Sequence, residues 1–206
     1  MNSRLNGDGE KRINVLKDDK DCFLPYKLTP YLTETFIRQT DIIGRIKVLE
    51  KYYYLPLKYA NPVGKRKDRF IFKAIVSRQN IRVFDAKTNE LIEIFKRLSE
   101  DEMFSPINNW GPYIKIFSLH TELVYTTEFF ETIPEIIQEN YIFLNILQQK
   151  EVLKNMYVLY EKTDLETAYK VATICLNGKR LSQHDFIMTL HNLEIDPLFK
   201  YPCLED

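Results

Sequence analysis

Two histidines and a cysteine near the C-terminus are the residues of this chain best suited to bind a metal. His184 and His191 are seven residues apart on one predicted helix, and Cys203 follows them. Their spacing fits no standard zinc pattern, so we expect no metal site and interpret both histidines as partly exposed helix residues. The sequence has no GxxxxGK[ST], GxGxxG, HExxH or CxxC motif. We therefore expect a protein that is not an enzyme and that needs no cofactor.

A basic cluster, GKRKDR at residues 64–69, follows four tyrosines and is the strongest signal for nucleic acid. Lys and Arg contact phosphates, and aromatic rings stack on bases. Tyr53, Lys65, Arg66 and Lys67 are therefore candidates for a weak contact with single-stranded nucleic acid. The alternative is a solvated loop with tyrosines that cover the mouth of a barrel. We favour this alternative because several phosphate contacts are needed for affinity and the chain has no net charge.

The composition bounds the class of protein. The chain has 206 residues, 45% of them hydrophobic, which is enough for one domain with an appendage. Lys plus Arg and Asp plus Glu tie at 29 each, which excludes a bulk polyanion binder. Its three cysteines, Cys22, Cys175 and Cys203, are far apart and predict reduced thiols rather than a disulfide framework. No apolar run is long enough to span a membrane, and we expect a soluble intracellular protein.

The order of periodic segments predicts the fold class. Residues 1–21 are polar and are expected to form a flexible arm. Leu91, Ile94, Phe95 and Leu98 have helical spacing. The expected elements are a helix at 31–39, strands at 42–49, 70–76 and 81–85, a loop at 52–68, a helix at 88–98, strands at 113–119 and 122–130, and helices at 134–160, 163–178 and from 182 onward.

Five strands with a helix between the third and the fourth are typical of an OB-fold, a small Greek-key barrel. We therefore predict an α+β protein: a five-stranded OB-fold-like β-barrel over residues 22–133, followed by a helical C-terminal extension over 134–206 that packs on the barrel. The rival interpretation is an α+β domain in which the same elements pair differently.

Three segments and the total length resemble the family of small OB-fold subunits of budding-yeast telomerase. FLPYKLTPYLTETFI (23–37) resembles the leading segment of that family, FKAIVSRQNIRVF (72–84) its second and third strands, and IKIFSLHTELVYTTEF (114–129) its closing hairpin. The family is similar in fold to the telomerase-recruiting OB domain of animal shelterin. The helical extension has no counterpart in it.

The resemblance implies a surface that docks on the telomerase reverse transcriptase. Tyr31 takes the place of the family's leading aromatic residue, and Arg78 stands where the budding-yeast protein has an acidic residue. Trp110 is a candidate anchor or a residue of the core or its lid. The implied partner-binding residues are Tyr31, Phe36, Arg38, Arg78, Asn80, Arg82, Asp85, Asn109 and Trp110.

The expected function is that of a non-catalytic, telomerase-associated adaptor in a nuclear ribonucleoprotein, which binds the reverse transcriptase and other holoenzyme subunits and supports telomerase recruitment at telomeres. The alternative is a single-stranded nucleic-acid-binding OB protein of telomere capping or replication. An unrelated interaction protein or a small enzyme is the third hypothesis, and it would need a cleft of titratable residues.

Overall fold

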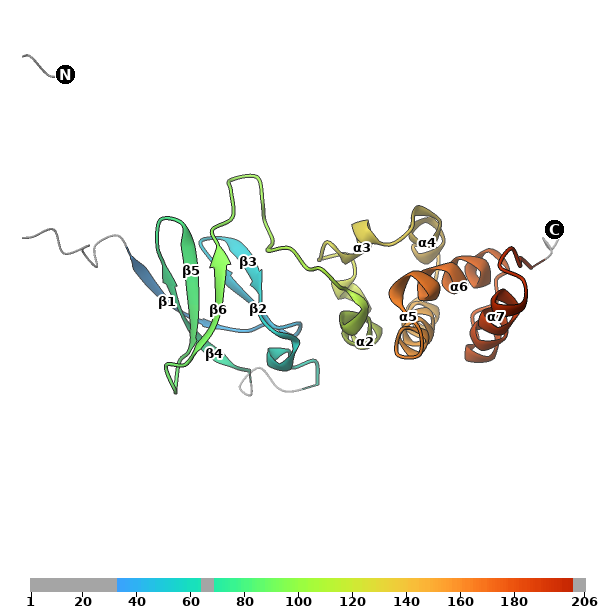
Figure 1. The fold of residues 1–206 in the computed structure, drawn as a ribbon, viewed down its shortest axis with the longest axis horizontal. Coiled ribbons are helices and arrows are strands. Elements are labelled where there is room, and N and C mark those ends of the chain that lie inside the picture. The colour runs from blue at the N-terminus through green and yellow to red at the C-terminus, as the bar shows by residue number, and fades with distance from the viewer. Residues whose placement is uncertain (1–32, 64–68, 202–206) are drawn as a thin grey trace, which may run out of the picture.

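The computed structural model describes residues 33–63 and 69–201, and it is α+β. The predicted arm at 1–21, Tyr31, Lys65, Arg66, Lys67 and Cys203 lie outside the described residues. Within them, six strands come first and six α-helices follow (Figure 1). The change from strands to helices falls at Gly111, ahead of the boundary expected at 133–134.

Four strands form an antiparallel sheet and two form a separate hairpin. The sheet has the order β1-β4-β5-β6, and the β2–β3 hairpin lies between the sheet and the helices (Figure 1). The bounds are β1 Glu34–Gln39, β2 Arg45–Val48, β3 Lys51–Tyr54, β4 Ile71–Val76, β5 Asn80–Asp85 and β6 Leu91–Lys96. The strands predicted at 70–76 and 81–85 are confirmed as β4 and β5, and the one at 42–49 contains β2.

The helix predicted at 31–39 is wrong over its described part. Thr35, Phe36 and Ile37 are β-branched or aromatic and suit a strand. They pair with Ile75, Ala74 and Lys73 of β4, so this segment becomes an edge of the sheet. The loop predicted at 52–68 is also wrong in part, because residues 51–54 form β3 and Leu57–Tyr59 form a 3-10 turn. Leu49 and Glu50, at φ 50° and 63°, form the tight turn of the hairpin.

The helix predicted at 88–98 is wrong as well, and its residues form β6. Asp85 accepts hydrogen bonds from the backbone N–H groups of Lys87 and Thr88, and Asn89 at φ 56° reverses the chain. A bulge opposite Val83/Phe84 then inserts one residue into β6. Because of the inserted residue, successive core-facing side chains of β6 are three residues apart in the sequence, as they would be on one face of a helix.

The strands predicted at 113–119 and 122–130 are wrong too. Residue 111 begins the helix α2 (Gly111–Leu119), because the side chain of Asn109 accepts a hydrogen bond from the Gly111 N–H and Pro112 occupies the first turn. A 3-10 turn at Thr121–Leu123 and the short helix α3 (Phe129–Thr132) follow. The described strands close no barrel, and only a 3-10 turn and no α-helix lies between β3 and β4 within the described residues, so the OB-fold prediction is not confirmed.

The last four helices form a bundle with distinct caps. Their bounds are α4 Glu135–Tyr141, α5 Ile146–Tyr160, α6 Leu165–Asn177 and α7 Gln183–Ile195. Ser182 opens α7 as predicted, where it forms a capping box with Asp185, and α6 ends at Gly178 as predicted. The single helix predicted at 134–160 is interrupted at residues 142–145, since Asn145 and Gln148 form a capping box that starts α5.

The described residues form two hydrophobic cores, one in the strand region and one in the helical region. The first fills the space between the sheet and the hairpin and includes Phe72, Ile81 and Val83. The second fills the helical bundle but also contains Ile43 and Tyr54 from the strand region. The strand region and the helical region therefore pack directly on each other.

The connector from residue 97 to residue 110 follows the hairpin closely. The backbone of Tyr52 pairs with both Met103 and Ser105, at 2.9 and 2.8 Å, and the Tyr52 ring stacks on Phe104 at 5.4 Å. The Ser105 hydroxyl also accepts a hydrogen bond from the Tyr54 N–H at 2.9 Å. The connector is thus attached to β3 through residues 103–105.

Candidate functional site

The face of the four-stranded sheet that points away from the hairpin is the first candidate surface. Side chains alternate between the two faces of a strand. Phe72, Ala74 and Val76 fill the core, so their neighbours in β4 point outward. The cross-strand registers extend this outer set across the sheet. We call it the outer sheet face, and it comprises Thr35, Ile37, Gln39, Ile71, Lys73, Ile75, Asn80, Arg82, Phe84, Leu91, Ile94 and Lys96.

The outer sheet face combines apolar and cationic side chains. Ile37 is 58% exposed and Ile94 is 51% exposed, and Ile71 and Leu91 are also exposed. Three members are cations and none is an Asp or Glu. No ion pair joins Lys73 or Arg82 to a carboxylate within residues 33–63 and 69–201.

The strand region as a whole is positively charged, like the outer sheet face. Residues 33–104 contain 15 Lys and Arg residues and 10 Asp and Glu residues, whereas residues 105–201 contain 8 Lys and Arg residues and 12 Asp and Glu residues. The zero net charge of the chain therefore conceals a positive strand region and a negative helical region. A partner with carboxylates would be attracted to the strand region.

The residues predicted to bind a partner are only partly brought together. Arg82 and Asn80 belong to the outer sheet face. Phe36 lies on the opposite, inner face, half-buried against the core, and Arg38 covers its ring at 4.9 Å. The Arg38 Nε also donates to the Lys47 carbonyl at 2.7 Å, so Arg38 joins β1 to the hairpin.

Arg78 and Asp85 lie at opposite ends of β5. Arg78 and Asn80, with Gln79 and Lys96–Leu98, line a hollow of about 570 Å³ beside the β4–β5 turn. Asp85 lies at the other turn, where hydrogen bonds from the Thr88 and Lys87 N–H groups hold the pKa of its carboxyl below the usual value. Asp85 thus shapes a turn.

Asn109 and Trp110 begin the helical region. Trp110 is only 6% exposed and contacts Tyr54 at 5.7 Å and Phe129 at 5.7 Å between ring centroids. This corrects its interpretation as an exposed anchor and supports the core role. The Asn109 amide donates to the Tyr160 hydroxyl at 3.1 Å, and its side-chain oxygen accepts from the Gly111 N–H at the start of α2, so Asn109 supports the helices.

The tyrosines considered for base stacking are occupied by protein contacts. Tyr53 is 1% exposed, its ring packs on Phe95, and its hydroxyl accepts a hydrogen bond from the Leu98 N–H at 3.4 Å. The interpretation of Tyr53 as a stacking residue is therefore corrected. Tyr59 packs edge-to-face on Phe72.

Among residues 33–63 and 69–201, no His, Cys, Asp and Glu side chains form a group that could bind a metal ion. His191 lies 3.5 Å from the carboxylate of Glu194, and His184 is exposed. His120 Nε2 lies 2.7 Å from the Pro62 carbonyl, so this residue links the strand and helical regions.

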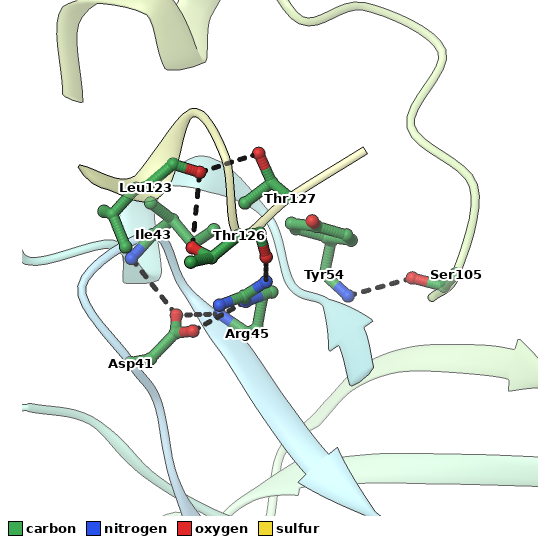
Figure 2. Close-up of polar contacts among 8 residues, drawn as sticks. All are labelled: Asp41, Ile43, Arg45, Tyr54, Ser105, Leu123, Thr126 and Thr127. Carbon is green, nitrogen blue, oxygen red and sulfur yellow. Dashed lines mark hydrogen bonds and ion pairs between the residues drawn. The ribbon is translucent and has the colours of Figure 1, made fainter. Parts of the chain in front are cut away.

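A buried arginine forms the polar centre of the junction between these regions. Figure 2 shows Arg45 between Asp41 and the turn that contains Thr126. Its Nε is 2.6 Å from the Asp41 carboxylate, its Nη1 donates to the Thr126 carbonyl at 3.5 Å, and the Tyr52 ring lies 4.7 Å from its Cζ. Burial opposes the charge, but the attraction and hydrogen bond of Asp41 outweigh it, so the pKa of Arg45 is raised.

The junction has the character of a structural contact. Tyr54 is one of the ionisable groups beside Arg45, and burial raises its pKa to about 12 despite the nearby guanidinium. A phenol with such a pKa stays neutral at neutral pH and is a poor general base. The cluster therefore holds two regions together rather than activating a nucleophile.

The second candidate surface is a group of exposed apolar side chains where α4 meets α5. We call it the apolar tip, and it comprises Ile142, Phe143, Ile146 and Leu147. Phe143 is 85% and Leu147 is 78% exposed. The Asn145–Gln148 capping box fixes the start of α5 within the tip. Glu139 and Lys150 lie one turn before Phe143 and one turn after Ile146.

Sequence reasoning identified only Asn80 and Arg82 of the outer sheet face and missed the apolar tip. The signal for the apolar tip was present in the run YIFLNIL with Asn145 and Gln148 at capping-box spacing, but the segment was interpreted as the middle of one helix. The signal for the outer sheet face was hidden because β6 was interpreted as a helix.

No described helix is both long and apolar enough to cross a bilayer.

Comparisons with known proteins give no assignment: no family model, curated protein or solved structure matches this chain.

Proposed function

We propose that this chain is a non-catalytic adaptor that binds a protein partner through the outer sheet face. The observation that supports this proposal is that contiguous apolar side chains lie on this face beside cations, and that no carboxylate belongs to it. Single exposed apolar residues are ordinary, but contiguous apolar patches mark interaction sites. A partner segment with apolar side chains beside carboxylates would match the face.

The apolar tip supports a second contact, as an adaptor requires. The backbone that carries Ile146 and Leu147 is fixed before binding because Asn145 caps α5. A pre-organised surface loses less conformational entropy when a partner binds. Large apolar side chains at a fixed corner are suited to an apolar groove on a partner protein.

The telomerase reverse transcriptase is the partner that the family resemblance implies, and it stays a prediction, as do the OB-fold relationship and the nuclear location. Arg78, Asn80 and Arg82 provide its support here, since all three lie on or beside the outer sheet face. Nucleic-acid binding is the alternative function. Because Tyr53 is buried, such binding would depend on the basic cluster at residues 64–69.

The test is co-purification of tagged full-length chain from source cells, followed by reconstitution with each identified partner. We expect Ile37→Ser/Ile94→Ser to lose a partner that the wild-type chain binds directly. Ile187→Ser/Ile195→Ser replaces two exposed isoleucines of α7 and is the matched control, which should retain it. Equal binding by both variants, with unchanged circular dichroism, would refute docking on the outer sheet face.

The same experiment separates the candidate functions. A reverse transcriptase recovered with its RNA would support the telomerase assignment. Salt-sensitive binding of single-stranded DNA that is lost in Lys65→Glu/Arg66→Glu/Lys67→Glu would support the nucleic-acid alternative. Phe143→Ser/Leu147→Ser tests the second surface and should lose a different partner from the one lost by the sheet variant.

A further inference from the structure

We infer that residues 18–32 of the same chain cover the outer sheet face when no partner is bound, and so compete with the partner. This inference rests on the proposed function of that face and concerns its regulation. The occupant is identified by the chemistry of its sequence, by its reach and by its attachment to the sheet.

The sequence of this segment complements the face in charge and in polarity. It reads DDKDCFLPYKLTPYL, in which Asp18, Asp19 and Asp21 precede large apolar residues, and with Lys20 and Lys27 its net charge is −1. The outer sheet face has the reverse charge, with Lys73, Arg82 and Lys96 among isoleucines. Carboxylates of Asp18, Asp19 and Asp21 would supply the counter-charges that Lys73 and Arg82 do not find within residues 33–63 and 69–201.

The attachment point places the segment beside the face. Residue 33 immediately precedes β1, and β1 is an edge strand of the sheet. Four strands span about 14 Å at a spacing of about 4.8 Å. Fifteen residues can extend to roughly 50 Å, so the segment can reach every strand after reversing direction.

Covalent attachment favours this occupant over a second copy. A short linker gives an effective concentration in the millimolar range, whereas a second copy must compete at its own concentration. An external partner must therefore displace the segment or outcompete it.

Cys22 provides a probe inside the segment for the full-length chain. A spin label is placed on Cys22 in a Cys203→Ser background, and Cys175 is buried and unavailable to it. Methyl NMR then measures relaxation enhancement at Ile71, Leu91 and Ile94. We expect strong enhancement there and none at Ile187 or Ile195 of α7. Weak or uniform enhancement at all five positions would overturn the inference.

Two arms identify the source and the chemistry of the contact. Mixing spin-labelled chains with separate isotope-labelled chains should abolish the effect, and persistence would assign the contact to a second copy and refute the inference. Asp18→Asn/Asp19→Asn/Asp21→Asn should weaken the enhancement. A synthetic peptide of residues 16–32 should bind that variant, and about tenfold more weakly after Lys73→Glu/Arg82→Glu. An unchanged affinity would refute the charge match.

The outcomes distinguish this inference from the proposed function. If the enhancement is absent while Ile37→Ser/Ile94→Ser still loses its partner, the face binds partners and the segment does not cover it. If the enhancement is present while the serine variant keeps every partner, the segment covers a face that has no docking role.

Discussion

The guanidinium of Arg45 and the carboxylate of Asp41 form an ion pair at 2.6 Å with a cation that is almost wholly buried. The same carboxylate accepts hydrogen bonds from the backbone N–H groups of Ile43 and Arg45, which closes the turn before β2. Because Arg45 also reaches the Thr126 carbonyl, this pair connects a local turn to the packing of the two regions.

Replacing Asp41 by Ala should lower the free energy of unfolding by about 3 kcal/mol, because it leaves a buried cation without its counter-ion. Urea unfolding followed by circular dichroism measures the change. Lys170→Ala breaks an exposed pair with Glu166 and is the control, which should leave the free energy of unfolding nearly unchanged. Equal effects of the two substitutions would contradict a structural role for the pair.

Trp110→Ala should lower the free energy of unfolding by about 3–5 kcal/mol, because it opens a cavity among Tyr54, Tyr113 and Phe129. Chemical denaturation of the two proteins gives the difference. Phe143→Ala removes an exposed ring and should change the free energy of unfolding by no more than about 0.5 kcal/mol. A loss as small for Trp110 as for Phe143 would return Trp110 to the list of surface anchors.

Asn145→Ala should cost about 1 kcal/mol, because the first turn of α5 loses its capping box. Faster amide hydrogen exchange at Gln148 would locate the effect, since that amide donates to the Asn145 side chain at 3.0 Å. Asn145→Ser keeps a capping oxygen and should restore most of the stability. If both variants are equally destabilised, the cap is not the cause.

Stability should fall steeply above pH 10, because burial raises the pKa of Tyr54 and of Tyr169 to about 12. Unfolded tyrosine loses its proton near pH 10, so the unfolded state binds fewer protons than the folded state between about pH 10 and 12. The stability that these groups contribute is therefore fully present below pH 10 and is lost as the pH rises through that window.

Urea midpoints from pH 8 to 11 test this dependence. Tyr54→Phe and Tyr169→Phe should each flatten the decline, because each removes a group that ionises only on unfolding. Tyr157 is half-buried, and its hydrogen bond to Glu161 raises the pKa of its phenol, so Tyr157→Phe should also flatten the decline. A wild-type slope in all three variants would show that other groups control the alkaline transition.

Cys175 should react with a thiol reagent only when the protein unfolds, because burial raises the pKa of its thiol to about 11 and the thiolate is the reactive form. Kinetics in a Cys22→Ser/Cys203→Ser background isolate this thiol. The reaction rate should follow the unfolding rate as urea is added. A fast reaction of the native protein would place the thiol at the surface.

Local signals that depend on a few neighbouring residues predicted their elements well. Residue 182 was predicted to begin the last helix, which is α7, and the alternation in residues 70–76 predicted β4. These features survive in the folded chain because no long-range contact opposes them. The structure of these segments could therefore be predicted from the local sequence, without the residues they contact in the fold.

Segments governed by distant contacts could not be assigned from the sequence. Leu91 and Ile94 have helical spacing, yet pairing with β5 and a single bulge make them strand residues on one face. Residues 113–117 alternate weakly like a strand, yet Asn109 and Trp110 start a helix that the bundle buries. The outer sheet face depends on the pairing of β6 with β5 and of β1 with β4, so most of it could not be identified before the registers were known.

The attachment of the connector to β3 makes the molecule a rigid spacer. Since Tyr52 holds Met103, Phe104 and Ser105, the fourteen residues between β6 and α2 do not act as a free tether. Partners bound at the outer sheet face and at the apolar tip would be kept at one separation and one relative orientation. Two such partners would meet each other at a local concentration set by the geometry of this chain rather than by diffusion.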